Sequence, residues 1–115
     1  MKKERLYYCN AHIEYRNKEQ IVLISYNTPV AIIDKQRDLI AIYRYKSTTT
    51  AQHLRKFQKW IYYNMPFEYY QRFRDLLNLG VKQKARVCFD CRSEYIDLFN
   101  YSYDYLQLFN NVLNI

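Results

Sequence analysis

Residues 39–61 read LIAIYRYKSTTTAQHLRKFQKWI, and this stretch decides the fold class. Residues 39–45 alternate as a β-strand does, with odd-numbered side chains on one face and even-numbered side chains on the other. A hydroxyl-rich cluster follows, in which Thr49 and Gln52 have the spacing of a helix capping box. The sequence therefore predicts a strand that leads directly into a helix over residues 49–63.

The predicted helix has two different faces. At 100° per residue, its apolar arc comprises His53, Leu54, Phe57, Trp60 and Ile61. The opposite side carries Arg55, Lys56 and Lys59, and the preceding segment adds Arg44 and Lys46. We therefore expect a helix that packs on a sheet and presents a positively charged outer surface.

Short extended runs precede this stretch, at residues 5–9, 12–16, 21–26 and 30–34. Polar turns separate these runs, and the turn after residue 26 contains a proline, which breaks a central strand. Short connections of this kind favour an antiparallel meander of hairpins.

A second helix is predicted over residues 66–79. Pro66 suits the first helical position, where a missing amide costs nothing, and Gly80 suits the left-handed position just after a helix. Residues 84–90 alternate as a further strand, and the apolar residues of segment 93–115 have mainly helical spacing.

The predicted fold is a single α+β domain over residues 1–115. In it, an N-terminal antiparallel β-meander packs against two central helices, and a C-terminal helical segment completes the core.

The chain is basic, with 18 Lys and Arg against 11 Asp and Glu and a formal net charge of +7. The cationic excess lies in residues 1–89, whereas residues 90–115 are net acidic. This distribution favours a polyanionic partner or an acidic protein surface.

No apolar run approaches the roughly 20 residues that span a bilayer, and no signal-peptide h-region is visible. We expect a cytoplasmic protein with no membrane partner.

No catalytic constellation is visible in the sequence. His53 falls on an apolar arc and His12 in an extended run, and no local pattern joins either to a nucleophile and an orienting acid. With a single glycine, the chain has no Gly-rich loop to cradle a phosphate. The sequence predicts a protein that is not an enzyme and holds no cofactor.

The cysteines offer one metal hypothesis. Cys88 and Cys91 have C-x-x-C spacing, and Cys9 and His12 have C-x-x-H spacing. Together they could supply three thiolates and one imidazole to a tetrahedral zinc ion. Neither pair carries the glycine or proline of a tight metal knuckle, and buried cysteine usually packs as a small apolar side chain. We predict no metal, and the sequence leaves open whether the four residues converge.

Two further features bear on partners. Thr48 and Thr49 lie at the predicted helix N-terminus, where free amides, the helix dipole and hydroxyls suit either an anion or simple capping. The 14 tyrosines include doublets at residues 62–63 and 69–70, which suit interfaces and base stacking, although an AT-rich genome also raises tyrosine content. The candidate partner-binding residues are Arg44, Lys46, Thr48, Thr49, Arg55, Lys56 and Lys59.

The runs NTPVAIID (27–34) and YKSTTT (45–50), followed by His53, Leu54 and Phe57, resemble a motif of small uncharacterised phage and plasmid proteins of low-GC bacteria. The resemblance implies a mobile-element origin but no activity. Small phage proteins of this size often bind host machinery, including defence complexes such as CRISPR effectors.

We therefore expect a protein that binds and modulates a nucleic-acid-containing host complex, most specifically an inhibitor of the anti-CRISPR type. The alternatives are a direct DNA- or RNA-binding accessory or regulatory protein and, third, a zinc-stabilised protein-interaction module. Homo-oligomerisation stays open.

Overall fold

The computed structural model describes residues 2–92, apart from residues 8, 17, 45–47 and 85. Within these residues, six strands form one antiparallel sheet in which each strand pairs with the next along the chain. The strands are β1 (Lys2–Arg5), β2 (Ala11–Tyr15), β3 (Gln20–Ser25), β4 (Thr28–Asp34), β5 (Leu39–Tyr43) and β6 (Val87–Cys91).

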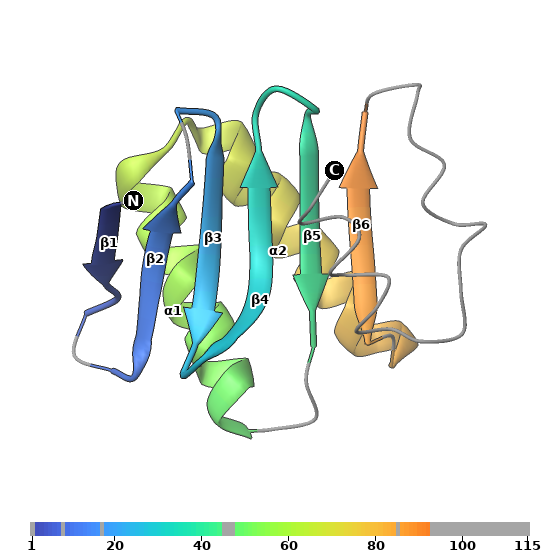
Figure 1. Cartoon of the computed structure of the whole chain (residues 1–115). Coiled ribbons are helices and arrows are strands. Elements are labelled where there is room, and N and C mark those ends of the chain that lie inside the picture. The colour runs from blue at the N-terminus through green and yellow to red at the C-terminus, as the bar shows by residue number, and fades with distance from the viewer. Residues whose placement is uncertain (1, 8, 17, 45–47, 85, 93–115) are drawn as a thin grey trace.

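Two helices, α1 (Thr48–Asn64) and α2 (Phe67–Gln83), lie between β5 and β6 in the chain. Both cover the same face of the sheet, behind the strands in Figure 1. The α+β fold with an N-terminal meander and two central helices is therefore confirmed. The predicted C-terminal helical segment lies outside the described residues. No helix in the described part of the chain is both long enough and apolar enough to cross a membrane.

The first predicted strand, over residues 5–9, is wrong. β1 ends at Arg5, and the chain then turns, with Tyr7 at a positive φ of 52°. The amide of Leu6 donates to the carbonyl of Ala11 (2.9 Å) and closes this turn onto β2. Tyr7 therefore lies in a reversal of the chain and not in a strand.

The main core lies between the sheet and the helices. All five residues of the apolar arc predicted for α1 are buried, as the helical period requires. Phe57 of α1 meets Phe73 of α2 edge to face, with ring centroids 5.4 Å apart. The sheet contributes buried side chains from its middle strands, among them Ile13, Leu23, Ile33, Ile40 and Ile42.

The face of the sheet opposite the helices carries a second buried apolar cluster, formed by Val22, Ile24, Ile32, Leu39, Ala41 and Tyr43. In β5 the odd-numbered residues belong to this cluster and the even-numbered residues to the main core, as the alternation predicted. Strands buried on both faces read as near-continuous apolar runs, which describes the sequences of β3 and β4.

The predicted end of the second helix is wrong. α2 continues to Gln83, and Lys84 takes the left-handed conformation (φ 55°) that was expected of Gly80. Gly80 has a different role, because a Cβ there would lie 2.6 Å from Cys88 Sγ and 3.1 Å from Arg44 Cδ. The glycine therefore allows α2 to approach β5 and β6 closely.

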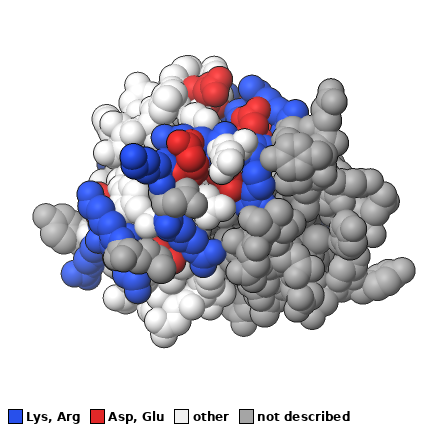
Figure 2. All heavy atoms as spheres, turned by 45° about the horizontal axis from the view of Figure 1, so that its top comes forward, with Lys and Arg blue, Asp and Glu red and all other residues white. Residues whose placement is uncertain are grey.

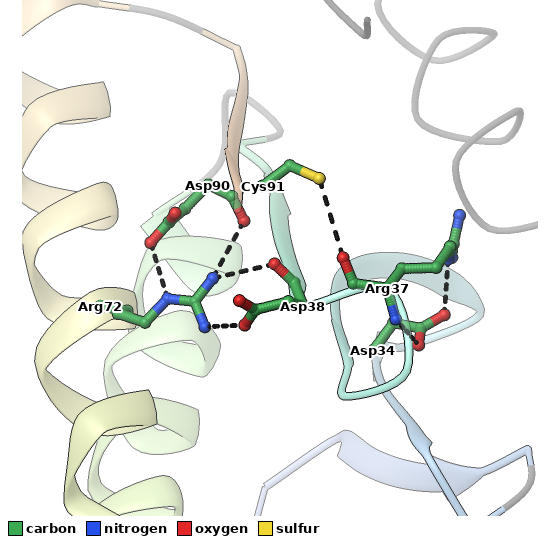
Figure 3. Close-up of polar contacts among 6 residues, drawn as sticks. All are labelled: Asp34, Arg37, Asp38, Arg72, Asp90 and Cys91. Carbon is green, nitrogen blue, oxygen red and sulfur yellow. Dashed lines mark hydrogen bonds and ion pairs between the residues drawn. The ribbon is translucent and has the colours of Figure 1, made fainter. Parts of the chain in front are cut away.

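A buried arginine joins α2 to the sheet (Figure 3). The Nε of Arg72 donates to Asp90 Oδ2 on β6 (2.9 Å), and its Nη2 donates to the backbone oxygen of Asp38 (3.0 Å). The guanidinium also forms an ion pair with the Asp38 carboxylate, in the turn between β4 and β5. Arg72 was not among the predicted core residues, yet its side chain is only 5% exposed.

The same turn is held by a second network, and Figure 3 shows its contacts between Arg37 and Asp34. The buried carboxylate of Asp34 accepts hydrogen bonds from Gln20 Nε2 (2.8 Å) and Arg37 Nε (2.6 Å). Burial by itself raises the pKa of Asp34, but these hydrogen bonds and the positive charge of Arg37 outweigh it, and the net pKa is lowered. The ionised carboxylate therefore organises the turn that Arg72 contacts.

Candidate functional site

The outer face of α1 carries the three predicted cations. Arg55, Lys56 and Lys59 are all exposed, while the apolar arc of the same helix faces the sheet. No carboxylate among the described residues lies within ion-pair distance of any of the three. The placement of the cations is thus as expected, and their role in binding stays a prediction.

Arg44 does not extend this surface. Its Nη1 donates to the carbonyl of Gly80 (2.5 Å), and its backbone amide donates to the carbonyl of Arg86. The side chain is half-buried between β5 and the end of α2. Arg44 therefore connects elements of the fold, which no local sequence pattern could indicate because Gly80 is far away in the chain.

The predicted helix start differs by one residue from the observed start. α1 already includes Thr48, so Thr49 lies inside the first turn and cannot be the N-cap. Thr48 is exposed and Thr49 is half-buried. Ser47 and the candidate partner-binding residue Lys46 lie outside the described residues.

Exposed aromatic rings continue the outer face of α1 towards α2. Tyr62, Tyr63 and Phe67 are 50%, 68% and 53% exposed. Tyr62 meets both Tyr63 and Tyr70 edge to face, each at a centroid distance of 5.1 Å, and Phe67 stacks on Tyr70 at 5.5 Å. The tyrosine doublets had indicated part of this cluster. Phe67 was missed because its contact with Tyr70 depends on where α2 begins.

Cations and rings enclose one open depression of about 240 Å³, lined by Arg55, Gln58, Lys59, Tyr62, Tyr63 and Tyr70. Cations also lie over neighbouring rings: Lys59 Nζ is 5.6 Å from the centroid of Tyr7, and Arg74 Cζ is 5.6 Å from that of Tyr70. We call the three cations of α1 together with Tyr62, Tyr63 and Tyr70 the basic–aromatic surface.

A second group of charges lies at the β1 edge of the sheet, the edge opposite β6. Figure 2 shows Lys and Arg gathered on the β1 side of the molecule, with Asp and Glu among them. All four residues of β1, Lys2–Arg5, are exposed, and they comprise three cations and one carboxylate. Charged residues on an edge strand discourage pairing with another chain. This protective role accounts for the charges of β1 without a ligand.

The four candidate metal ligands do not form one site. Cys9 and His12 lie at β2, whereas Cys88 and Cys91 lie on β6. These strands are four positions apart in the sheet, about 19 Å at the usual strand spacing. Across the described part of the chain, no three His, Cys, Asp or Glu side chains gather closely enough for a metal ion.

The C-x-x-C pair is also divided within its own strand. Cys88 belongs to the core under the helices, and Cys91 packs against the cluster on the opposite face. Burial raises the pKa of the Cys88 thiol despite the nearby charge of Arg44. A thiol of this kind is a poor nucleophile and a poor metal ligand at neutral pH, so the geometry does not support the zinc-stabilised module.

His53 is hydrogen-bonded to Ser25, with 2.7 Å between Nδ1 and Oγ. Both residues are buried, at 3% and 4% exposure, and burial together with the charge of Lys56 lowers the pKa of His53. A serine nucleophile needs access to substrate and a base oriented by a third group. Neither feature is found here within the described residues, and the pair links α1 to β3 instead.

The chain matches one family model, described as a family of unknown function (DUF8033), over residues 1–71. The match covers more than half of the sequence, so the protein belongs to this family. The matched residues include β1–β5, all of α1 and the start of α2. No curated protein and no solved structure matches the chain.

Proposed function

We propose that this DUF8033 member is a non-enzymatic binding protein that engages a nucleic-acid-containing host complex through the outer face of α1. The observation that carries the proposal is the set of exposed cations, Arg55, Lys56 and Lys59, none of which has a described carboxylate partner. Cations of this kind suit phosphates, because phosphate contacts release condensed counterions.

The rings beside the cations support a specific interface rather than a diffuse charge. Tyr and Arg are enriched at the energetic centres of interfaces, where rigid rings bury area at little entropic cost. Tyr62 and Tyr63 are at least half exposed and lie next to Lys59 in the same depression. The other side of α1 is packed into the core, which keeps this surface rigid.

In its specific form, the proposal is an anti-defence inhibitor of the anti-CRISPR type that acts in the host cytoplasm. This form follows from the resemblance of residues 27–57 to phage and plasmid proteins. A direct DNA- or RNA-binding regulatory protein is the second candidate, favoured by the combination of cations and exposed rings that single-strand binders use.

Two charge-reversal variants, one at the site and one elsewhere, test the proposal. Arg55→Glu/Lys56→Glu/Lys59→Glu changes the outer face of α1, and Lys18→Glu/Lys35→Glu/Lys82→Glu makes the same change of net charge at exposed lysines elsewhere. Affinity is measured for a guide-RNA-loaded CRISPR effector and for the same RNA free, over a range of salt concentrations. Circular dichroism and denaturant unfolding check that both variants fold.

We expect the α1 variant to lose binding and the control variant to keep it. If free RNA is the ligand, the salt dependence of that binding also flattens, because fewer counterions are released. If a protein surface of the complex is the partner, the loss occurs only with the effector. A folded α1 variant that binds like the control variant contradicts the proposal.

A further inference from the structure

The depression at the junction of α1 and α2 has two chemically different walls. Arg55 and Lys59 contribute positive charge, and Tyr62, Tyr63 and Tyr70 contribute aromatic rings. Tyr62 is held between the other two rings, at interplanar angles of 89° to Tyr63 and 74° to Tyr70. Tyr63, at 68% exposure, is the ring most open to a ligand.

This combination suits one nucleotide rather than a phosphate alone. Lys and Arg can neutralise the backbone charge, while an exposed ring can stack on any base, since every base has a π-face. A depression of about 240 Å³ is small, and it is open on its outer side, so a strand could pass across it.

Duplex nucleic acid cannot use the aromatic wall. Paired bases stack on one another and present only their edges in the grooves, so a helix offers phosphates to the cations and nothing to the rings. Unpaired bases can leave the stack and lie on aromatic side chains. A site with this lining would therefore favour single strands over duplexes.

We propose that this depression binds an unpaired nucleotide, with its base stacked on Tyr63 and its phosphate held by Arg55 and Lys59. The inference rests on the proposed function and names the ligand as single-stranded nucleic acid. Within a nucleic-acid-containing complex, the contact would be a strand segment left unpaired.

Fluorescence anisotropy with labelled oligo(dT), oligo(U) and a duplex of equal length tests the inference. We expect the wild type to bind both single strands at least about tenfold more tightly than the duplex. Tyr63→Leu should weaken single-strand binding roughly 5- to 150-fold, the equivalent of one base–aromatic contact. Tyr63→Phe keeps the ring and should bind within about twofold of wild type.

Tyr26→Leu is the matched control, because Tyr26 is 54% exposed and does not line the depression. It should bind as wild type does. Equal affinity for single strands and duplex, or an unaffected Tyr63→Leu variant, overturns the inference. If neither oligonucleotide binds but the α1 charge reversal abolishes binding to the effector complex, this inference fails while the proposed function stands.

Discussion

The two helices have the same length, 17 residues, and cover the same face of the sheet, yet they use their cations in opposite ways. α2 buries Arg72 against the sheet, where carboxylates from β6 and from the β4–β5 turn bind it. α1 turns Arg55, Lys56 and Lys59 outward, and none of the three lies within ion-pair distance of a described carboxylate.

A buried cation without partners would cost several kcal/mol, so the partners of Arg72 are part of the fold. We expect the exposed cations of α1 to contribute little to stability, because none of them forms an ion pair with a described carboxylate. We therefore expect the partners of each charge, and not the charge content of a helix, to separate structural residues from binding residues. The following predictions test this contrast.

The largest effect is expected for Arg72→Met, which leaves two carboxylates without their cation. Removing one member of a buried pair typically costs 3–5 kcal/mol, and because Asp38 and Asp90 are partly exposed we expect about 2–3 kcal/mol. Denaturant unfolding measures the change. The control, Arg74→Met, breaks a largely exposed pair with Asp75 and should cost less than about 1 kcal/mol. Equal losses would remove the distinction between the two arginines.

The close approach of α2 to β6 predicts a second, smaller effect. Gly80→Ala improves helix propensity by about 1 kcal/mol, but the new Cβ meets the buried Cys88 Sγ, and overpacking costs about 1–3 kcal/mol. We expect a net loss of stability that Cys88→Ala partly relieves in the double variant. A double-mutant cycle measures this coupling, and additive effects would mean that the two side chains do not collide.

His53, on the buried face of α1, predicts a pH dependence of stability. Because its pKa is lowered from 6.5 in the folded protein, the unfolded chain binds a proton at pH values where the folded protein does not. The free energy of unfolding should therefore be highest above pH 6.5 and fall as the pH decreases below it. Urea unfolding at several pH values should show this slope in wild type and in His12→Gln, but a reduced slope in His53→Gln. Identical slopes in all three proteins would assign the effect to other groups.

The smallest effect on folding is expected for the α1 charge reversal. Exposed substitutions away from caps and ion pairs usually change stability by less than about 0.5 kcal/mol each. Thermal unfolding of Arg55→Glu/Lys56→Glu/Lys59→Glu should therefore lie close to that of wild type, in contrast to Arg72→Met. A large loss would mean that these cations have structural partners after all.

The sequence predicted α1 well because its apolar period is regular and begins after a hydroxyl cluster. The prediction failed at the end of α2. Glycine is favoured both just after a helix and where two elements approach closely, and Gly80 has the second role, against Cys88. The role of Arg72 could not be predicted either, because its carboxylate partners lie in other elements of the fold.

The same limit applies to the candidate site. The exposure of the three cations of α1 could be predicted from helical periodicity alone, because the period places them on the face opposite the apolar arc. Arg44 was grouped with them, but the structure places it against Gly80, a contact that arises only when α2 packs on β5. The depression depends on the angle at which α1 and α2 meet at Tyr62 and Tyr70, which no local pattern specifies.

The strand order has a consequence for how the chain folds. β1–β5 pair through short turns, whereas β6 pairs with β5 only after the whole helical hairpin has been traversed. Pairings local in sequence form quickly, and a long intervening loop adds closure entropy that delays the pairing of its ends. The five-strand meander can thus assemble first, with β6 added to its edge when α2 docks. In pulsed hydrogen exchange during refolding, the amides of β6 should gain protection after those of β3 and β4.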